Sequence, residues 1–288
     1  MTLEEAARVL AAVSETPDLD ARLLWEHAFT FPAPPSAARG IAERSEALAD
    51  AEQVSLRSTK PRAALGEAAK VFADYVARRL SHEPVAYIAG IRGFWTIDVE
   101  VTPDVLIPRP DSETLLDAAV AHFGAASPRR ILDLGTGSGA LLLAALDQWP
   151  AATGLGIDAS EAALKVARGN AARIAPGRAE MRCGDWAEGV DERFDLVLCN
   201  PPYVEAGAVL DPQVLREPAA ALFAGDDGLS AYRALAPQIA RVTGGIACIE
   251  IGWRQAAAVT ALLEQHGLGV TLRRDFAGND RCLVALPK

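Results

Sequence analysis

Four consecutive residues, Asn200, Pro201, Pro202 and Tyr203, follow the apolar run 194–199. A strand that meets two prolines must end, because neither proline can donate to a sheet and the residue before a proline disfavours helix. Open α/β sheets bind their ligands at the carboxyl ends of strands. The turn offers an amide side chain, carbonyl oxygens without competing N–H groups, and an aromatic ring. These groups can hold a planar –NH2 while its nitrogen attacks, which indicates methyl transfer to an amino group; the alternative is that Asn200 caps a turn and Tyr203 packs in the core.

A glycine-rich loop follows the predicted strand 131–135 and precedes the predicted helix 140–148. Glycines at such a position allow a tight turn and bring a ligand close to the backbone and the helix N-terminus. Asp158 lies at the end of the next strand, where a carboxylate binds ribose hydroxyls. The loop alone fits a nicotinamide cofactor and S-adenosylmethionine equally well, and the proline turn favours the methyl donor. The expected cofactor-binding residues of the loop are Gly135, Thr136, Gly137, Ser138 and Gly139.

Asp185 and Trp186 follow the third strand of this series. An acid beside a tryptophan can bind the exocyclic amine of an adenine and pack against its ring. The alternative is a loop tryptophan that covers core. We expect both residues to bind the cofactor.

Composition narrows the class of protein. The chain has 288 residues and a net charge of −10, most of it carried by residues 81–288. Nucleic-acid binding needs clustered positive charge, so a nucleic-acid substrate is not expected. The apolar runs are short of a membrane span and the start of the chain is acidic, which favours a cytoplasmic protein without a membrane partner. The four cysteines match no zinc spacing and fall in apolar, strand-like segments, so no metal is expected and the thiols are expected to be buried.

The chain divides by pattern into three parts. Residues 1–82 are predicted to be a helical domain, with helices at 3–13, 19–29 and 71–80 and a less regular helix–loop–helix over 36–70. Residues 83–110 are predicted to be a β-hairpin linker, because residues 85–107 alternate like strands joined by glycine turns. Residues 111–288 alternate strands and helices, which predicts a mostly parallel, doubly wound α/β sheet. Its seven strands are expected at 131–135, 153–158, 179–183, 194–199, 245–251, 269–275 and 282–286, and the last pair is expected to be a hairpin that makes one strand antiparallel.

Several further motifs extend the pattern on both sides of the turn. They are Arg78-Arg79 with the segment 83–90, Val105 to Pro110 with Glu113, Arg216-Glu217-Pro218, residues 221–223, Gly225 with 227–229, Glu250-Ile251-Gly252, and residues 275–278 with Asp280-Arg281. With the glycine loop and the proline turn, they make residues 78–288 resemble the release factor glutamine methyltransferase family. Members modify the glutamine of the Gly-Gly-Gln motif in peptide chain release factors.

The resemblance carries specific expectations. It implies a Rossmann-like S-adenosylmethionine-dependent fold, with S-adenosylhomocysteine as the product. It implies that Gly135 to Gly139, Asp158, Trp186 and Asn200 contact the cofactor, and that Asn200, Pro201, Pro202 and Tyr203 hold the substrate glutamine. The N-terminal domain would help to dock the release factor, although residues 30–70 depart from the family pattern. Arg109 and Glu113 either shape the pocket or serve local structure.

Three other functions stay open at this point. A glutamine methyltransferase of a ribosomal protein shares the turn and the cofactor. An adenine-N6 nucleic-acid methyltransferase shares the turn, but it would need basic recognition elements. A binding scaffold without catalysis is disfavoured because the glycine loop and Asn200 are both intact.

Overall fold

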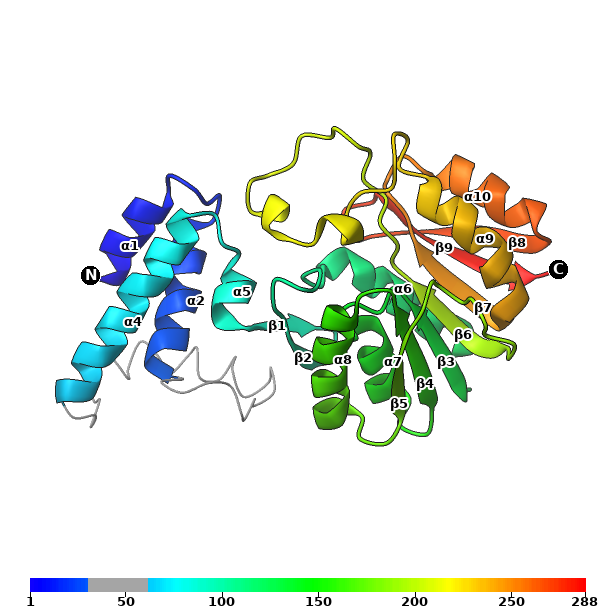
Figure 1. The fold of residues 1–288 in the computed structure, drawn as a ribbon, viewed down its shortest axis with the longest axis horizontal. Helices are drawn as coiled ribbons and strands as arrows, with labels where there is room; N and C mark the ends of the chain where they lie inside the picture. Colours follow the sequence, from blue (N-terminus) through cyan, green and yellow to red (C-terminus); the bar gives the residue numbers. More distant parts are fainter. Residues whose placement is uncertain (31–61) are drawn as a thin grey trace. The chain divides into compact units, whose positions relative to one another are not determined.

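The computed structural model describes residues 1–30 and 62–288 (Figure 1). The chain folds as two compact units. The first comprises Met1–Ile91 with Leu210–Arg216, and the second comprises Arg92–Val209 with Glu217–Lys288. The sequence predictions that fall between residues 31 and 61 lie outside the described residues, and the expected domain boundaries at 82 and 110 stay predictions.

The first unit is helical. It contains α1 (Leu3–Leu10), α2 (Pro17–Thr30), α4 (Arg62–Leu80) and α5 (Val85–Ala89). A reciprocal cap begins α1: the Glu5 N–H donates to the Thr2 hydroxyl at 3.1 Å, and the Thr2 N–H donates to the Glu5 carboxylate at 2.8 Å. The helices bury one apolar cluster that includes Leu10, Leu24 and Phe72. The predicted helices at 3–13, 19–29 and 71–80 are confirmed with shifted ends.

The expected hairpin is shorter than predicted. Residues Val85–Ala89 form α5, so the prediction of a strand there was wrong. A run of five residues is too short to distinguish the periodicity of a helix from that of a strand. Val85 and Ile88, three residues apart, pack against the same apolar cluster, as they do on one face of a helix. Gly90 then ends the helix with φ +70°, a conformation that favours glycine. The hairpin itself consists of β1 (Ile91–Phe94) and β2 (Ile97–Glu100).

The second unit is built on a seven-stranded sheet in the order β5-β4-β3-β6-β7-β9-β8, and all its residues are described. Neighbours from β5 to β7 run parallel, and β9 runs antiparallel to both β7 and β8. This confirms the predicted sheet with one antiparallel strand. The strands are β3 (Arg130–Leu134), β4 (Thr153–Asp158), β5 (Ala179–Cys183), β6 (Phe194–Cys199), β7 (Thr243–Glu250), β8 (Leu268–Arg274) and β9 (Asp280–Pro287).

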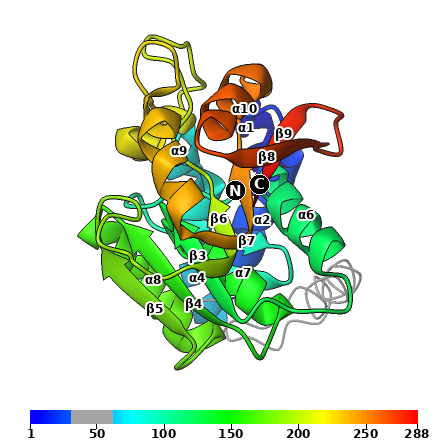
Figure 2. The same cartoon turned by 90° about the vertical axis from the view of Figure 1, so that its right-hand side faces the viewer.

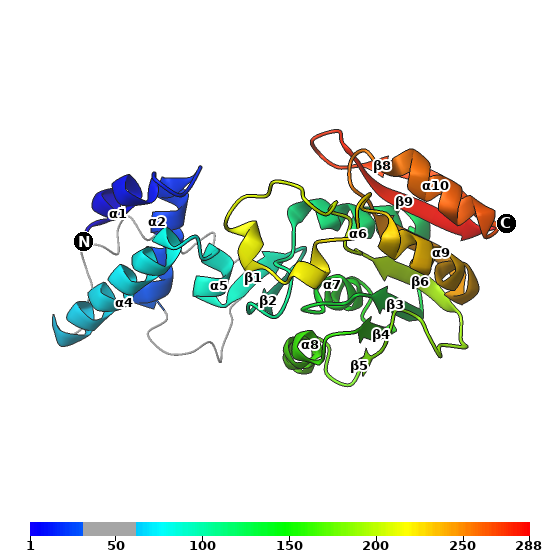
Figure 3. The same ribbon diagram turned by 45° about the horizontal axis from the view of Figure 1, so that its top comes forward.

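Helices cover both faces of the sheet (Figures 2 and 3). One layer contains α6, α7 and α8, and the other contains α9 and α10. Val197, Ala247 and Leu283, from three neighbouring strands, are completely buried beneath them. The bounds are α6 (Glu113–Phe123), α7 (Ala140–Gln148), α8 (Glu161–Ile174), α9 (Ser230–Val242) and α10 (Ala256–Gln265), with short 3-10 turns at Pro110–Ser112 and Ala219–Ala221. A further 3-10 turn, Val214–Arg216, belongs to the first unit.

The parallel register brings the ends of five strands to one edge of the sheet. Leu134 pairs with Cys199, Asp158 pairs with Cys183, and Cys199 pairs with Ile249. The loops that follow β3 to β7 therefore leave the sheet side by side, which is where ligands bind in such folds. Among the described helices, none is both long and apolar enough to cross a membrane.

Candidate active site

The glycine loop joins β3 to α7 in a conformation that needs glycine. Gly135, Gly137 and Gly139 have φ values of +74°, +55° and +83°, in the left-handed region. A Cβ built on Gly135 would lie 3.2 Å from the Trp186 ring and 4.0 Å from the backbone oxygen of Asn200. The glycine loop, Trp186 and Asn200 therefore lie next to one another, and glycine at position 135 leaves space between them.

Asp158 fixes this loop from the end of β4. Its Oδ2 accepts the Gly137 N–H at 2.8 Å, and its Oδ1 accepts the Ser160 N–H at 2.9 Å. Each carboxylate oxygen has two lone pairs, so both oxygens keep capacity for a hydroxyl donor. The two backbone N–H groups thus fix the orientation of the half-buried carboxylate.

Trp186 sits in a conformation that non-glycine residues rarely adopt. Its φ is +51°, and its half-buried ring packs against the core of the second unit beside Gly135. Such backbone outliers concentrate at ligand sites, because surrounding structure must hold them in place. Asp185, the residue before it, is exposed.

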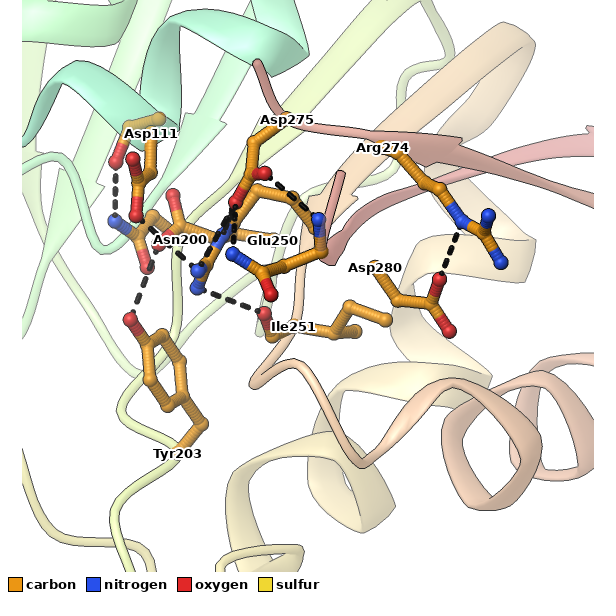
Figure 4. A network of polar contacts seen from close by, with 11 residues as sticks. Asp111, Asn200, Tyr203, Glu250, Ile251, Arg274, Asp275 and Asp280 are labelled. Carbon is orange, nitrogen blue, oxygen red and sulfur yellow. Dashed lines mark hydrogen bonds and ion pairs between the residues drawn. The ribbon is translucent and has the colours of Figure 1, made fainter. Parts of the chain in front are cut away.

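The proline turn begins where β6 ends, and its two polar side chains have fixed partners (Figure 4). Asn200 donates its amide Nδ2–H to the Ser112 hydroxyl at 3.0 Å. Tyr203 donates its hydroxyl to Oε1 of Glu250 at 3.2 Å. This bond fixes the half-buried Asn200 amide with Nδ2 as the donor and Oδ1 as the acceptor.

Known proteins of one family match this chain over nearly its whole length. The family model for the PrmC N-terminal domain matches residues 2–90, and that for the methyltransferase small domain matches residues 111–223. A release factor glutamine methyltransferase of Rhodospirillum rubrum is 40% identical over 287 residues, which cover 97% of this chain and 82% of that protein. A second, from Caulobacter vibrioides, is 45% identical over 221 residues, which cover 74% of this chain and 76% of that protein. The chain belongs to the release factor glutamine methyltransferase family.

A solved structure supports the fold of this methyltransferase. The hMettl16 catalytic domain, solved in complex with an RNA hairpin, aligns with a TM-score of 0.54 at 14% identity and covers 77% of this chain and 81% of that one. At this identity the likeness extends to the fold alone.

Two residues of the methyltransferase with unresolved roles now have partners. Glu113 accepts the backbone N–H of Trp95 at 2.8 Å, at the turn of the β1–β2 hairpin, which favours a structural role. Arg109 forms an ion pair with buried Glu217, whose other oxygen accepts the Ile107 N–H at 2.9 Å. This pair ties residues 107–109 to the segment that follows the proline turn.

Sequence reasoning missed two buried carboxyl groups at the site. Asp133, near the end of β3, accepts a hydrogen bond from the Thr136 hydroxyl at 2.6 Å. This buried bond fixes the glycine loop to the strand that precedes it. Burial raises the pKa of Asp133 to about 7, although the bond from Thr136 acts in the opposite direction. The sequence did offer one indication of this role, because Asp133 lies two residues before the glycine loop.

The second missed carboxyl is Glu250. Burial raises the pKa of Glu250 to about 7, while hydrogen bonding from Ser112, the positive charge of Arg281 and hydrogen bonding from Tyr203 lower it. Arg281 in turn pairs with Asp111 at 3.1 Å and with Asp275 at 3.3 Å (Figure 4). Only tertiary structure joins these residues, so no local pattern could have revealed the network.

The cysteine prediction was correct for three positions and wrong for one. Cys199, Cys248 and Cys282 are buried thiols, whereas Cys183 is exposed at the end of the edge strand β5. In the described part of the chain, no three His, Cys, Asp or Glu side chains gather in a way that could bind a metal.

Proposed function

We propose that this chain transfers a methyl group from S-adenosylmethionine to the side-chain amide nitrogen of the glutamine in the Gly-Gly-Gln motif of peptide chain release factors. The names of its relatives support the substrate. The observation that carries the chemistry is the orientation of Asn200, whose Nδ2 is engaged by Ser112 while Oδ1 is left to accept.

The residues at the strand ends fit the cofactor. Gly135 to Gly139 would contact it along their backbone, and the oriented Asp158 carboxylate would accept ribose hydroxyls. Trp186 and exposed Asp185 would bind the adenine, and Asn200 would lie beside both ligands. When bound, the cofactor supplies an electrophilic methyl group on a sulfonium.

The proline turn would activate the substrate amide by holding its hydrogens. An amide nitrogen is a poor nucleophile because its lone pair is delocalised into the carbonyl. Asn200 Oδ1 and the Pro201 backbone oxygen would accept the two N–H bonds, and Pro202 adds no competing N–H. Tyr203 would cover the amide plane. Such orientation can contribute up to ~7–11 kcal/mol to lowering the barrier, and exclusion of water strengthens the bonds.

The wider organisation follows from this function. Residues 1–82 would help to dock the release factor, 83–110 would link the domains, and 111–288 would carry catalysis. The enzyme would work in the cytoplasm, without direct nucleic-acid or membrane contacts.

The test is incubation of the purified chain with S-adenosylmethionine and an unmethylated release factor, followed by mass spectrometry of the tryptic peptide that contains Gly-Gly-Gln. We expect one methyl group, located by fragmentation on the glutamine side chain, and none when that glutamine is replaced by alanine. Parallel arms contain ribosomal proteins and adenine-containing DNA. Methylation confined to either of those arms would replace the proposal with one of the alternatives.

A further inference from the structure

Glu250 occupies a position in the sheet that brings it level with the proline turn. Strands β6 and β7 run parallel, with Cys199 paired with Ile249. The next residue on each strand is therefore Asn200 on one side and Glu250 on the other. Glu250 is 1% exposed, so it cannot itself touch a substrate.

Two arms connect Glu250 to the turn, and Figure 4 shows the direct one, from Tyr203. The first is direct, from the Tyr203 hydroxyl to Oε1 at 3.2 Å. The second passes through Ser112, which is 3% exposed and accepts the Asn200 amide at 3.0 Å. Hydrogen bonding from the Ser112 hydroxyl lowers the pKa of the Glu250 carboxyl, which places the two groups next to one another. The first and last residues of the turn thus share one buried anchor.

Stability does not account for a carboxyl group at this position. Its Oε2 is buried and, within the described parts of the chain, has no hydrogen-bond partner. A buried oxygen without a partner disfavours folding, and burial raises the pKa of this group for the same reason. Arg281 faces the carboxyl but is also bonded to Asp111 and Asp275, so its charge is shared.

We propose that Glu250 is a positioning residue for methyl transfer, which fixes the Tyr203 ring directly and the Asn200 amide through Ser112. The inference rests on the proposed function of the turn. A carboxyl oxygen suits the task because its two lone pairs accept from both hydroxyls at once. Loss of the anchor lets the two side chains move independently, and the substrate amide is then held less often in the reactive geometry.

The experiment compares Ser112→Ala, Tyr203→Phe and Glu250→Leu with the parent chain. Each single-arm variant should lower kcat about tenfold, and Glu250→Leu about 100-fold, because it removes both arms. The KM for release factor and the affinity for S-adenosylmethionine should stay within about threefold of the parent. Glu250→Gln keeps one acceptor oxygen and should fall between the parent and Glu250→Leu.

A mutant cycle separates positioning from a structural role. In the Ser112→Ala/Tyr203→Phe background both arms are already lost, so adding Glu250→Leu should change kcat by less than about threefold. The control is Leu263→Ala, which removes buried side-chain volume near the C-terminal end of α10 and should lower the melting temperature while leaving kcat unchanged.

Two results would overturn the inference: a kcat of Glu250→Leu within threefold of the parent, or an undiminished effect of Glu250→Leu in the double-variant background. Failure of the proposed function looks different, because the parent chain itself would then leave release factors unmethylated.

Discussion

At the scale of single residues, the proposed methyl transfer depends on the orientation of two polar side chains, Asn200 and Asp158. Asn200 is held by Ser112. In the proposed mechanism its Oδ1 accepts from the substrate amide, and Asn200→Ala removes that acceptor. We expect kcat to fall by ~100-fold or more, as when one preorganised hydrogen-bond partner of a reacting group is removed. Cofactor affinity, measured by calorimetry on the same sample, should be largely retained. Turnover within severalfold of the parent would refute this mechanism.

A second residue-scale prediction concerns Asp158. Its carboxylate is oriented by the N–H groups of Gly137 and Ser160, and we propose that it accepts ribose hydroxyls. Asp158→Ala should weaken S-adenosylmethionine binding ~10–100-fold, the usual range for hydrogen bonds to a charged group. Asp191→Ala, which removes an exposed loop carboxylate, is the control and should bind normally. Unchanged affinity in the Asp158 variant would remove its assignment.

At the scale of elements, the glycine loop makes a prediction with a matched control. Gly135 and Gly177 have similar φ values, +74° and +71°, but a Cβ at Gly177 meets nothing within 4 Å. Each alanine substitution should cost ~1–2 kcal/mol of stability through backbone strain. Only Gly135→Ala places a methyl group against Trp186, so only this variant should lose cofactor affinity, by about tenfold. Equal affinities in the two variants would contradict the loop assignment.

The elements also show how far sequence could reach. Strands of the sheet and the helices between them were predictable within a few residues, since long periodic segments and glycine or proline breaks mark them. The helical state of Val85–Ala89 was not predictable, because five residues fit the periodicity of a helix or of a strand equally well. The packing of Ile88 in the apolar cluster of the first unit favours the helix. Likewise, Asn200 to Tyr203 form a contiguous motif, whereas Ser112 and Glu250 reach them only through the folded sheet.

At the scale of the whole molecule, two buried carboxyl groups should make stability depend on pH. Burial raises the pKa of Asp133 from 3.8 and of Glu250 from 4.5, both to about 7. Between these values the folded state binds more protons than the unfolded state, so the free energy of unfolding falls as pH rises. The contribution is complete below the unfolded pKa values and is lost once pH passes about 7.

Denaturant unfolding at about pH 5 and about pH 8 measures this loss, which should be on the order of 3 kcal/mol per group. Asp133→Asn should flatten the dependence because its amide does not titrate. A parent chain that gains stability over this window, or an unchanged slope in Asp133→Asn, would show that these carboxyl groups are ionised in the folded state.

The central claim is that one amide is held by its hydrogens between Asn200 and Pro201 while it accepts a methyl group. The most direct measurement is a crystal structure of the chain with S-adenosylhomocysteine and a peptide that contains Gly-Gly-Gln. We predict that the glutamine nitrogen lies within hydrogen-bond distance of Asn200 Oδ1 and the Pro201 backbone oxygen, with the cofactor sulfur facing it. A sulfur that faces away from the Pro201 oxygen, with no space for a glutamine side chain between them, would contradict the account.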